Sequence, residues 1–394
     1  MNPATFFMLV FPLIAIGLAF REKHMIAKQV STIPYRINVN GTRGKSTVTR
    51  LLTAALLEAG IPTVGKTTGS KSCILSFEME DGKYLARETE LIRRPEGPNI
   101  KEVKLVIREA LQKDARAIVA ECMAVAPDYQ KVFAKEYLRS NFSIVTNVRE
   151  DHMDVQGPSL QDAADAFMAA VPESTTLIVL QDDFTAYFSE AAEGRNIVLR
   201  VADASLVSEE YCGKFSFPVF EENVALALEA ALALGIGEDV AMAGMLKAIP
   251  DSGAICFQKI KGKAGEGVLI NAFSANDPTT TIAIWDYLES REQVNRDTTL
   301  IMNCRNDRMD RARYFLKGVL EKIPAKSLIL IGEGTGLIYT NRKTLSFSEV
   351  TNLEGFSAKN IAQYLQERCK SKDVFLGIGN YFGVEEICRE LGGE

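Results

Sequence analysis

The sequence predicts an α/β protein in which two domains, each built on a parallel sheet covered by helices, follow one N-terminal transmembrane helix. The first residues are apolar and uncharged, and from about Ile33 apolar β-rich runs alternate with helical stretches. This alternation stops near Gly253 and then restarts. At 394 residues the chain exceeds the size of one hydrophobic core, so two domains are expected. The predicted segments are an anchor, a larger central domain and a smaller C-terminal domain: 1–21, 22–253 and 254–394.

The apolar N-terminus has the length of a membrane span. Residues 6–20 carry no charge, and the uncharged stretch from Met1 to Phe20 matches the ~20 residues that cross a bilayer. The first cations, Arg21, Lys23 and Lys28, follow the apolar run, which predicts a cytoplasmic location for the rest of the chain. Pro12 near the middle suggests a membrane partner, because neighbouring helices satisfy the carbonyl that it frees. The expected protein is thus a single-pass protein of the cell membrane; a buried N-terminal helix or strand is the alternative.

Composition limits the functions of the remaining chain. The 47% apolar and 24% charged fractions are those of an ordinary globular protein. A net charge of −6 gives no general attraction to nucleic acid, which is excluded as a partner. The seven cysteines have no metal-ligand spacing and indicate a reducing compartment. With only two histidines, a His-rich metal site is excluded.

Strands and helices are expected in alternation through both domains. The strands of the central domain are predicted within residues 36–40, 115–122, 141–148 and 175–180. Its helices are predicted after the loop that ends at Ser46, within 160–171, and at 223–234 and 240–249, the last stopping before Pro250. The strands of the C-terminal domain are predicted within residues 267–273, 298–304, 327–334 and 373–379.

The strongest local signal is N-G-T-R-G-K-S, from Asn40 to Ser46, between a strand and a helix. This is the place of a phosphate-binding loop: glycines let the backbone approach the phosphates, a Lys reaches the β and γ oxygens, and a Ser hydroxyl ligates Mg²⁺. A strict Walker A motif would have Gly in place of Val39. The alternative interpretation is an ordinary turn.

Two further strand ends carry polar groups. Glu121 ends the apolar strand A-I-V-A-E, at the rim where open α/β sheets bind ligands, and could hold a divalent cation; alone, it could also be a solvated surface residue. The strand F-S-I-V is followed by T-N-V-R-E-D-H-M-D, which brings His152 together with Asp151 and Asp154. A lone His is usually structural, but His152 among acids at a strand end favours a functional role.

Taken together, the loop, the strand-end Glu and the D-H-M-D segment resemble the ATPase domain of Mur ligases, whose loop has the form G-T-x-G-K-[ST]. The resemblance implies a Mur-ligase-like P-loop ATPase domain and a smaller Rossmann-like C-terminal α/β domain. It implies Mg²⁺ ligation by Ser46, Glu121 and His152, with Lys45 on the phosphates. It also matches N-A-F-S-A-N-D-P-T-T at 271–280 to a stretch of the family's C-terminal domain. The implied nucleotide-binding residues are Asn40, Gly41, Thr42, Arg43, Gly44, Lys45, Ser46, Thr47 and the helix-opening Asn223.

Four stretches resemble, more narrowly, the ligase subunit of capsule-type poly-γ-glutamate synthase. They are R-R-P-E-G-P-N-I at 93–100, E-C-M-A-V-A-P-D-Y-Q at 121–130, E-D-H-M-D-V-Q-G-P at 150–158 and I-M-N-C-R-N-D-R-M-D-R at 301–311. The resemblance covers nearly the whole chain.

The chain departs from the wider Mur pattern at three points. The segment about fifteen residues after His152 lacks the Lys that many members carbamylate, which puts a second-metal mechanism in doubt. The linker Gly-Arg pair appears as Gly253-Ala254, so Arg305 and Arg308 are the candidates for the missing cation. No UDP-binding domain fits between residue 21 and the loop, which makes peptidoglycan nucleotide precursors unsuitable substrates.

The resemblance implies an ATP- and Mg²⁺-dependent ligase. It would join glutamate through its γ-carboxylate, by way of an acyl-phosphate, to glutamate or a growing poly-γ-glutamate chain. Implied partners are small membrane subunits of the same synthase complex, with a homo-oligomer left open. Two alternatives stay open: a Mur-type ligase for a soluble substrate such as folate, and a membrane-tethered regulatory ATPase that forms no bond.

Overall fold

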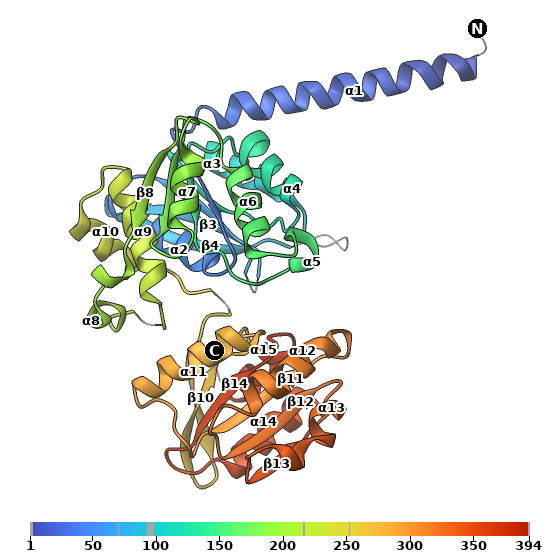
Figure 1. Ribbon diagram of the computed structural model, residues 1–394, viewed down its shortest axis with the longest axis vertical. Helices are drawn as coiled ribbons and strands as arrows, with labels where there is room; N and C mark the ends of the chain where they lie inside the picture. Colours follow the sequence, from blue (N-terminus) through green and yellow to red (C-terminus); the bar gives the residue numbers. More distant parts are fainter. Residues whose placement is uncertain (1–2, 70, 93–97, 216, 252, 393–394) are drawn as a thin grey trace. The chain divides into compact units, whose positions relative to one another are not determined.

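The chain folds into two compact units, Met1–Asp251 and Ser252–Glu394, which the colours of Figure 1 distinguish along the sequence. The computed structural model describes residues 3–69, 71–92, 98–215, 217–251 and 253–392. Part of the stretch at 93–100 therefore lies outside the described residues. Each unit is built on its own sheet, and each sheet is mostly parallel, so the expected α/β class is confirmed.

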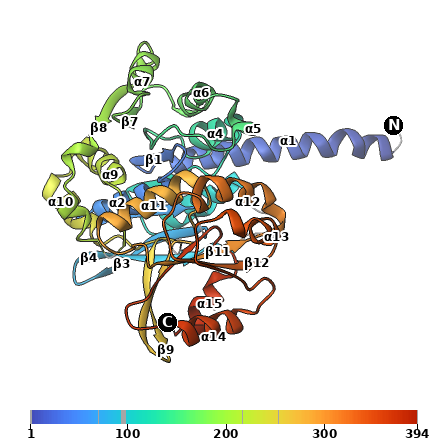
Figure 2. The same ribbon diagram turned by 60° about the horizontal axis from the view of Figure 1, so that its bottom comes forward.

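Unit 1 has an eight-stranded sheet of order β4-β3-β2-β5-β1-β6-β7-β8. All pairs are parallel except β2–β3 and β3–β4, and Figure 2 shows β3 and β4 side by side. β1, β2 and β5 are buried along nearly their whole length, and β5, A-I-V-A-E, is apolar up to its last residue, as expected of a strand covered on both faces. The strands are β1 (Tyr35–Asn40), β2 (Thr63–Thr67), β3 (Cys73–Glu80), β4 (Lys83–Glu90), β5 (Ala117–Glu121), β6 (Phe142–Val145), β7 (Thr176–Leu180) and β8 (Val198–Ala202).

Helices cover this sheet and provide the core. α2 packs on β2 and β5 and against α9 and α10, through a helix interior of buried Ala and Leu side chains. α3 packs on β2 and β5 as well, and α9 packs on β7 and β8. The helices are α1 (Pro3–Val30), α2 (Lys45–Glu58), α3 (Val103–Gln112), α4 (Pro127–Lys131), α5 (Met153–Gln156), α6 (Leu160–Ala170), α7 (Thr185–Ala192), α8 (Glu209–Cys212), α9 (Glu221–Ala233) and α10 (Glu238–Met245).

The N-terminal segment does not form the expected transmembrane helix. α1 is continuous over 28 residues, so Arg21, Glu22, Lys23 and Lys28 lie in the same helix as the apolar run. In the part of the chain that the structure describes, no helix combines the length and apolar character that a membrane crossing requires. The predictions of a transmembrane anchor at 1–21 and of a single-pass location in the cell membrane are therefore wrong.

Unit 2 has a six-stranded sheet of order β13-β12-β11-β14-β10-β9, parallel except for the β9–β10 pair. Its apolar core lies between the sheet and α14 and α15, which pack on each other. The strands are β9 (Cys256–Gly262), β10 (Gly265–Asn271), β11 (Thr299–Cys304), β12 (Ser327–Gly332), β13 (Glu349–Asn352) and β14 (Val374–Ile378). The helices are α11 (Pro278–Ser290), α12 (Met309–Phe315), α13 (Gly336–Thr340), α14 (Ala358–Arg368) and α15 (Val384–Glu390).

A buried arginine ties the helix after the loop to the sheet edge and to the end of unit 1. Arg50 of α2 is 2% exposed; its guanidinium donates to Glu88 Oε1 on β4 at 2.6 Å and to the Ile249 carbonyl at 3.0 Å. Because a guanidinium taken out of water needs its counter-charge, Glu88 compensates most of the cost of burying Arg50.

Glu88→Ala is expected to lower the free energy of unfolding by ~2–4 kcal/mol, since it leaves a buried cation without its carboxylate. The matched control is Glu78→Ala, which removes a carboxylate from an exposed pair with Arg87 and is expected to cost ~0–1 kcal/mol. Urea denaturation of both variants measures the difference. Equal losses would show that the Arg50–Glu88 pair contributes no more than a surface pair.

Candidate functional site

Three of the strand ends singled out in the sequence meet at one edge of the unit 1 sheet. β1 lies between β5 and β6 and is parallel to both, so the loop after β1, Glu121 at the end of β5 and the loop after β6 share the carboxyl edge. Val39 of β1 is in register with Glu121. Open α/β sheets bind ligands at this edge. The site is therefore formed by segments far apart in the sequence.

The loop from Asn40 to Ser46 packs closely against Thr146 and Asn223, and at its two glycines there is no room for a Cβ. Gly41 has φ +115°, and a Cβ there would lie 2.3 Å from Thr146 Oγ1 and 2.7 Å from the Thr146 backbone nitrogen. Gly44 has φ +84°, and a Cβ there would lie 2.2 Å from Asn223 Oδ1. The loop thus runs between the β6 end and the start of α9, which brings Asn223 to the predicted nucleotide site.

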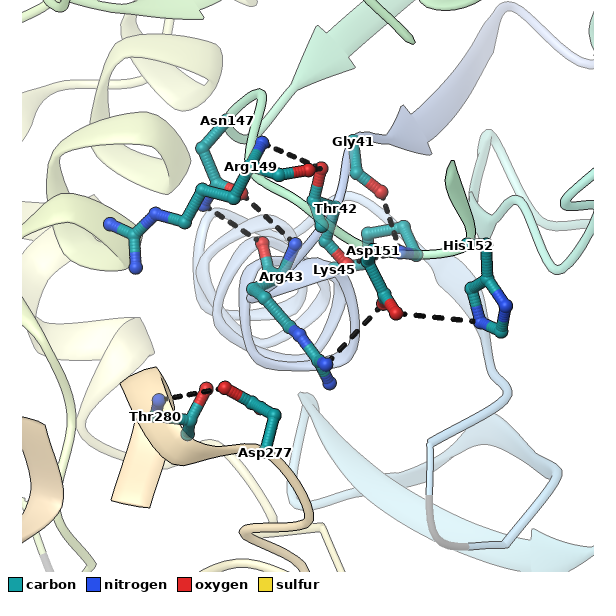
Figure 3. Close-up of polar contacts among 10 residues, drawn as sticks. All are labelled: Gly41, Thr42, Arg43, Lys45, Asn147, Arg149, Asp151, His152, Asp277 and Thr280. Atoms are coloured by element: carbon teal, nitrogen blue, oxygen red, sulfur yellow. Dashed lines mark hydrogen bonds and ion pairs between the residues drawn. The ribbon is translucent and has the colours of Figure 1, made fainter. Parts of the chain in front are cut away.

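The loop after β6 fixes the backbone of the phosphate loop (Figure 3). The Asn147 side chain accepts from the Arg43 N–H at 3.0 Å and donates to the Arg43 carbonyl at 3.2 Å. The Thr42 N–H donates to the Asn147 carbonyl at 3.0 Å, and the Arg149 N–H donates to Thr42 Oγ1 at 3.0 Å. These bonds hold the turn in shape before any ligand arrives.

Lys45 is folded back onto the loop that precedes it. Its ammonium donates to the carbonyls of Gly41 at 2.6 Å and Thr42 at 2.9 Å. Burial lowers the pKa of Lys45, the neighbouring Glu121 carboxylate opposes this shift, and the nearby Arg43 reinforces it. A half-buried cation held by backbone carbonyls can exchange them for phosphate oxygens at little cost in hydrogen bonds.

Ser46 and Glu121 are in direct contact. Ser46 Oγ donates to Glu121 Oε2 at 2.7 Å, and the Thr68 N–H donates to the same oxygen at 2.7 Å. Glu121 is 4% exposed, so its carboxylate is held in one orientation beside the hydroxyl. A Ser hydroxyl and a carboxylate are the oxygen ligands that Mg²⁺ uses in phosphate-loop enzymes.

His152 lies at a strained position on the same edge. It has φ +49° and precedes α5, its side chain is 55% exposed, and its Nε2 lies 3.7 Å from Asp151 Oδ1. A positive φ is uncommon for a residue with a Cβ and often marks a functional position. Among the described residues, no group of three or more His, Cys, Asp and Glu side chains could hold a metal ion. A magnesium site of Ser46, Glu121 and His152 therefore stays a prediction.

Two observations test whether the residues present fit a nucleotide. Gly41 and Gly44 leave room that a Cβ would fill. In addition, the hydroxyl of Thr146, which is fully buried, has no hydrogen-bond partner among the described residues and lies beside Gly41. Buried polar groups are normally satisfied, so this donor suits a ligand or its water. Both features, with Lys45, fit a phosphate group at this turn.

Sequence reasoning missed two contributors to this edge. The Thr68 N–H binds Glu121, but a backbone donor leaves no sequence signal. Asp251 was not among the predicted site residues, yet a Cβ at Gly69 would lie 2.2 Å from Asp251 Oδ2 and 2.8 Å from Ser46 Oγ. Asp251 therefore brings a second carboxylate close to Ser46. Asp251 lies between Pro250 and Gly253, a composition typical of any linker, so the sequence around it does not indicate a site.

The remaining predicted residues lie in unit 2. Arg305 follows β11 and forms a two-pronged pair with Asp307, at 2.8 and 2.6 Å, with its guanidinium 5.2 Å from the Phe382 ring centroid. It lines a cavity of about 590 Å³ at the carboxyl ends of the parallel strands. The side chain of Arg308 lies outside the described residues. In the stretch at 271–280, Asp277 caps α11 by accepting from the Thr280 N–H at 2.8 Å.

Such a sheet edge, with a glycine loop, a half-buried Lys and a Ser–Glu pair, is typical of phosphate-loop enzymes that bind a nucleoside triphosphate. Two family models match the chain: the Mur ligase middle domain over residues 39–212, and the poly-gamma-glutamate synthase CapB C-terminal domain over residues 257–394.

Similar proteins agree with both models. PGA synthase CapB of Bacillus subtilis (strain 168) is 41% identical over 377 residues, 95% of this chain and 93% of that protein. Capsule biosynthesis protein CapB of Bacillus anthracis is 41% identical over 367 residues, 93% of this chain and 78% of that protein. A folylpolyglutamate synthase/dihydrofolate synthase of Yersinia pestis, solved with AMPPNP and a Mn ion, shares the fold at a TM-score of 0.64 and 15% identity, over 94% of this chain and 92% of that one.

The chain therefore belongs to the CapB family of poly-gamma-glutamate synthases, a branch of the Mur ligases. It is an ATP-dependent ligase that forms amide bonds, and the predictions of that family and enzyme class are confirmed.

Gly41→Ala is expected to weaken ADP binding at least ~10-fold, because the methyl group would meet the backbone of Thr146 at a φ that L-residues avoid. The matched control is Gly60→Ala, with φ +75° but nothing within 4 Å of the new Cβ, which is expected to cost only about 1 kcal/mol of stability. Titration calorimetry with ADP measures both. Wild-type affinity in Gly41→Ala would mean that the turn does not approach the phosphates.

Proposed function

We propose that this chain polymerises glutamate through its γ-carboxylate, with ATP converted to ADP and phosphate. The observation that carries the proposal is the contact of Ser46 with Glu121 beside the Lys45 turn, within a chain 41% identical to PGA synthase CapB over 95% of its length. Glutamate and the poly-γ-glutamate chain are the substrates that this relationship supports.

The reaction needs ATP because a carboxylate is a poor acyl donor in water. One γ-carboxylate oxygen attacks the γ-phosphorus of ATP, the bond to the β–γ bridging oxygen breaks, and ADP leaves with the electron pair. The amine of the acceptor then attacks the acyl carbon, phosphate leaves, and the amine loses a proton. Lys45 is suited to holding the phosphates, because its ammonium is already at the turn.

The metal is proposed to be Mg²⁺. Ser46 and Glu121 would hold it, and His152 would have to turn toward them from its place beside Asp151. When bound, the ion supplies positive charge to the phosphate oxygens. The Yersinia relative, solved with AMPPNP and Mn, supports a divalent ion with a nucleotide at this fold.

Contacts of the nucleotide are proposed for the turn from Asn40 to Thr47 and for Asn223, which touches the turn at Gly44. Arg305 is paired with Asp307 and lines the unit 2 cavity, so it and Arg308 stay predictions for a second cation. Association with small membrane subunits of a synthase complex, and a homo-oligomer, also stay predictions.

The deciding experiment measures ADP release by the purified full chain with ATP and Mg²⁺, with and without L- or D-glutamate. Glutamate-dependent ADP release together with a polymer product is the expected result. ADP release that depends on folate instead would indicate the soluble-substrate ligase. ATP turnover indifferent to amino acids would indicate a regulatory ATPase, and either outcome overturns the proposal.

A further inference from the structure

The phosphate loop contains an arginine between its two glycines. Arg43 has its backbone N–H and carbonyl both bonded to the Asn147 side chain, so its Cα is fixed. Its guanidinium lies 3.4 Å from Asp151 Oδ2, and the side chain is 35% exposed. Figure 3 shows the Arg43 side chain directed from the turn toward Asp151. A cation is therefore anchored in the turn itself.

Arg43 and Lys45 place two cations in one short turn, with two carboxylates nearby. The Arg43 guanidinium lies 3.4 Å from Asp151, and Glu121 accepts from Ser46, the residue after Lys45, at 2.7 Å. Two cations in one turn attract an anion that carries more than one negative charge. A triphosphate, with its several negative oxygens, is an anion of the right charge and size.

The pairing with Asp151 does not prevent this use of Arg43. Partly exposed ion pairs contribute little to stability, so a phosphate can displace the carboxylate or share the guanidinium. A guanidinium has five donors in one plane, so one edge can face Asp151 while another meets phosphate oxygens. The carboxylate then serves to orient the side chain before the nucleotide binds.

The other candidate cations, Arg305 and Arg308, lie in unit 2. Arg305 is already engaged by both oxygens of Asp307 and lies over the Phe382 ring, within the cavity of unit 2. The linker position where many Mur ligases have Arg is Ala254 here. The chain therefore lacks the usual second-domain cation at the linker, while the phosphate loop carries one of its own.

We propose that Arg43 supplies, from within the phosphate loop, the cation that stabilises transfer of the γ-phosphoryl group to the glutamate carboxylate. The inference rests on the proposed function. In the transfer step the bond between the γ-phosphorus and the bridging oxygen breaks while the bond to the carboxylate oxygen forms. The Arg43 guanidinium offsets the negative charge on the γ oxygens during this step. It forms no covalent bond and gains or loses no proton. Arginines that act on a transferring phosphoryl group in this way accelerate the step by ~10³–10⁵-fold in other phosphate-loop enzymes.

The test compares Arg43→Ala, Arg43→Lys and Arg305→Ala in the purified full chain. The readouts are kcat for glutamate-dependent ADP release, ADP affinity by calorimetry, and recovery of activity on adding guanidinium ion. Arg87→Ala, which removes an exposed arginine of the same unit paired with Glu78 and Glu80, is the matched control.

Arg43→Ala is expected to lose at least ~10²-fold in kcat, with ADP affinity within about threefold of wild type, because the side chain acts on the γ-phosphate that ADP lacks. Guanidinium ion should restore part of the activity of Arg43→Ala and none of that of Arg305→Ala. The inference would be overturned by a wild-type kcat in Arg43→Ala, or by a loss of ADP affinity in Arg43→Ala as large as its loss of kcat. It would also be overturned if guanidinium ion restored activity only in Arg305→Ala. A wild-type chain without glutamate-dependent ADP release would instead overturn the proposed function.

Discussion

Lys45→Ala is expected to reduce glutamate-dependent ADP release by at least ~10³-fold, the largest effect of any single replacement in this chain. Lys45 is a half-buried cation of the turn, and its ammonium is held by the Gly41 and Thr42 carbonyls. Its removal deprives both ground-state and transferring phosphates of their nearest positive charge. Steady-state ADP release and ADP calorimetry should therefore both show the loss.

The matched control is Lys247→Ala, which removes a 59% exposed ammonium paired with Glu58 in the same unit. Because surface pairs contribute ~0–1 kcal/mol, this variant should keep wild-type turnover. Full activity in Lys45→Ala would mean that the nucleotide binds elsewhere, and the ligase site would have to be sought away from the turn.

The lowered pKa of Lys45 adds a pH dependence with a defined sign. Burial disfavours the charged ammonium, whereas a bound phosphate favours it, so nucleotide binding is coupled to proton uptake by Lys45. ADP affinity should accordingly fall as pH rises through the alkaline range below the ordinary Lys pKa. The same titration in Lys45→Ala should lack this component.

The parallel strands of the site were predictable because burial on both faces favours apolar sequences. β5 and β6 are such runs, A-I-V-A-E and F-S-I-V, whereas β1, Y-R-I-N-V-N, carries polar residues along its length; the polar ends of the three strands gave the candidate residues. β4 gave no such signal: its eight residues, K-Y-L-A-R-E-T-E, alternate between exposed and half-buried, so an edge strand rich in charge was not expected there.

Contacts that depend on sheet order could not be read from the chain. The placement of β5 between β1 and β2 brings Glu121 to Ser46, and no local pattern states which strands become neighbours. The same holds for the approach of Asp251 to Gly69. The N-terminal prediction was wrong because the apolar segment was expected to end as a separate helix at residue 21. α1 instead continues through the cations after Phe20 to Val30.

Glu121→Gln is expected to reduce glutamate-dependent ADP release by ~10²–10³-fold and to raise the Mg²⁺ concentration needed for half-maximal activity, because it removes one negative charge without changing side-chain size. The amide can still accept from Ser46 and from the Thr68 N–H, so the local fold should persist. Thermal unfolding should therefore shift little, which separates a lost metal ligand from a lost fold.

His152→Asn provides the comparison that ranks the two proposed ligands. Glu121 is 4% exposed and already in contact with Ser46, whereas the His152 side chain is 55% exposed and lies beside Asp151. A ligand that is held in place before binding pays less ordering entropy, so Glu121→Gln should weaken binding of Mn²⁺, measured by electron paramagnetic resonance, more than His152→Asn does. If His152→Asn proves the more damaging, His152 must be the anchor of the metal, and the Ser46–Glu121 contact then serves the fold of the turn.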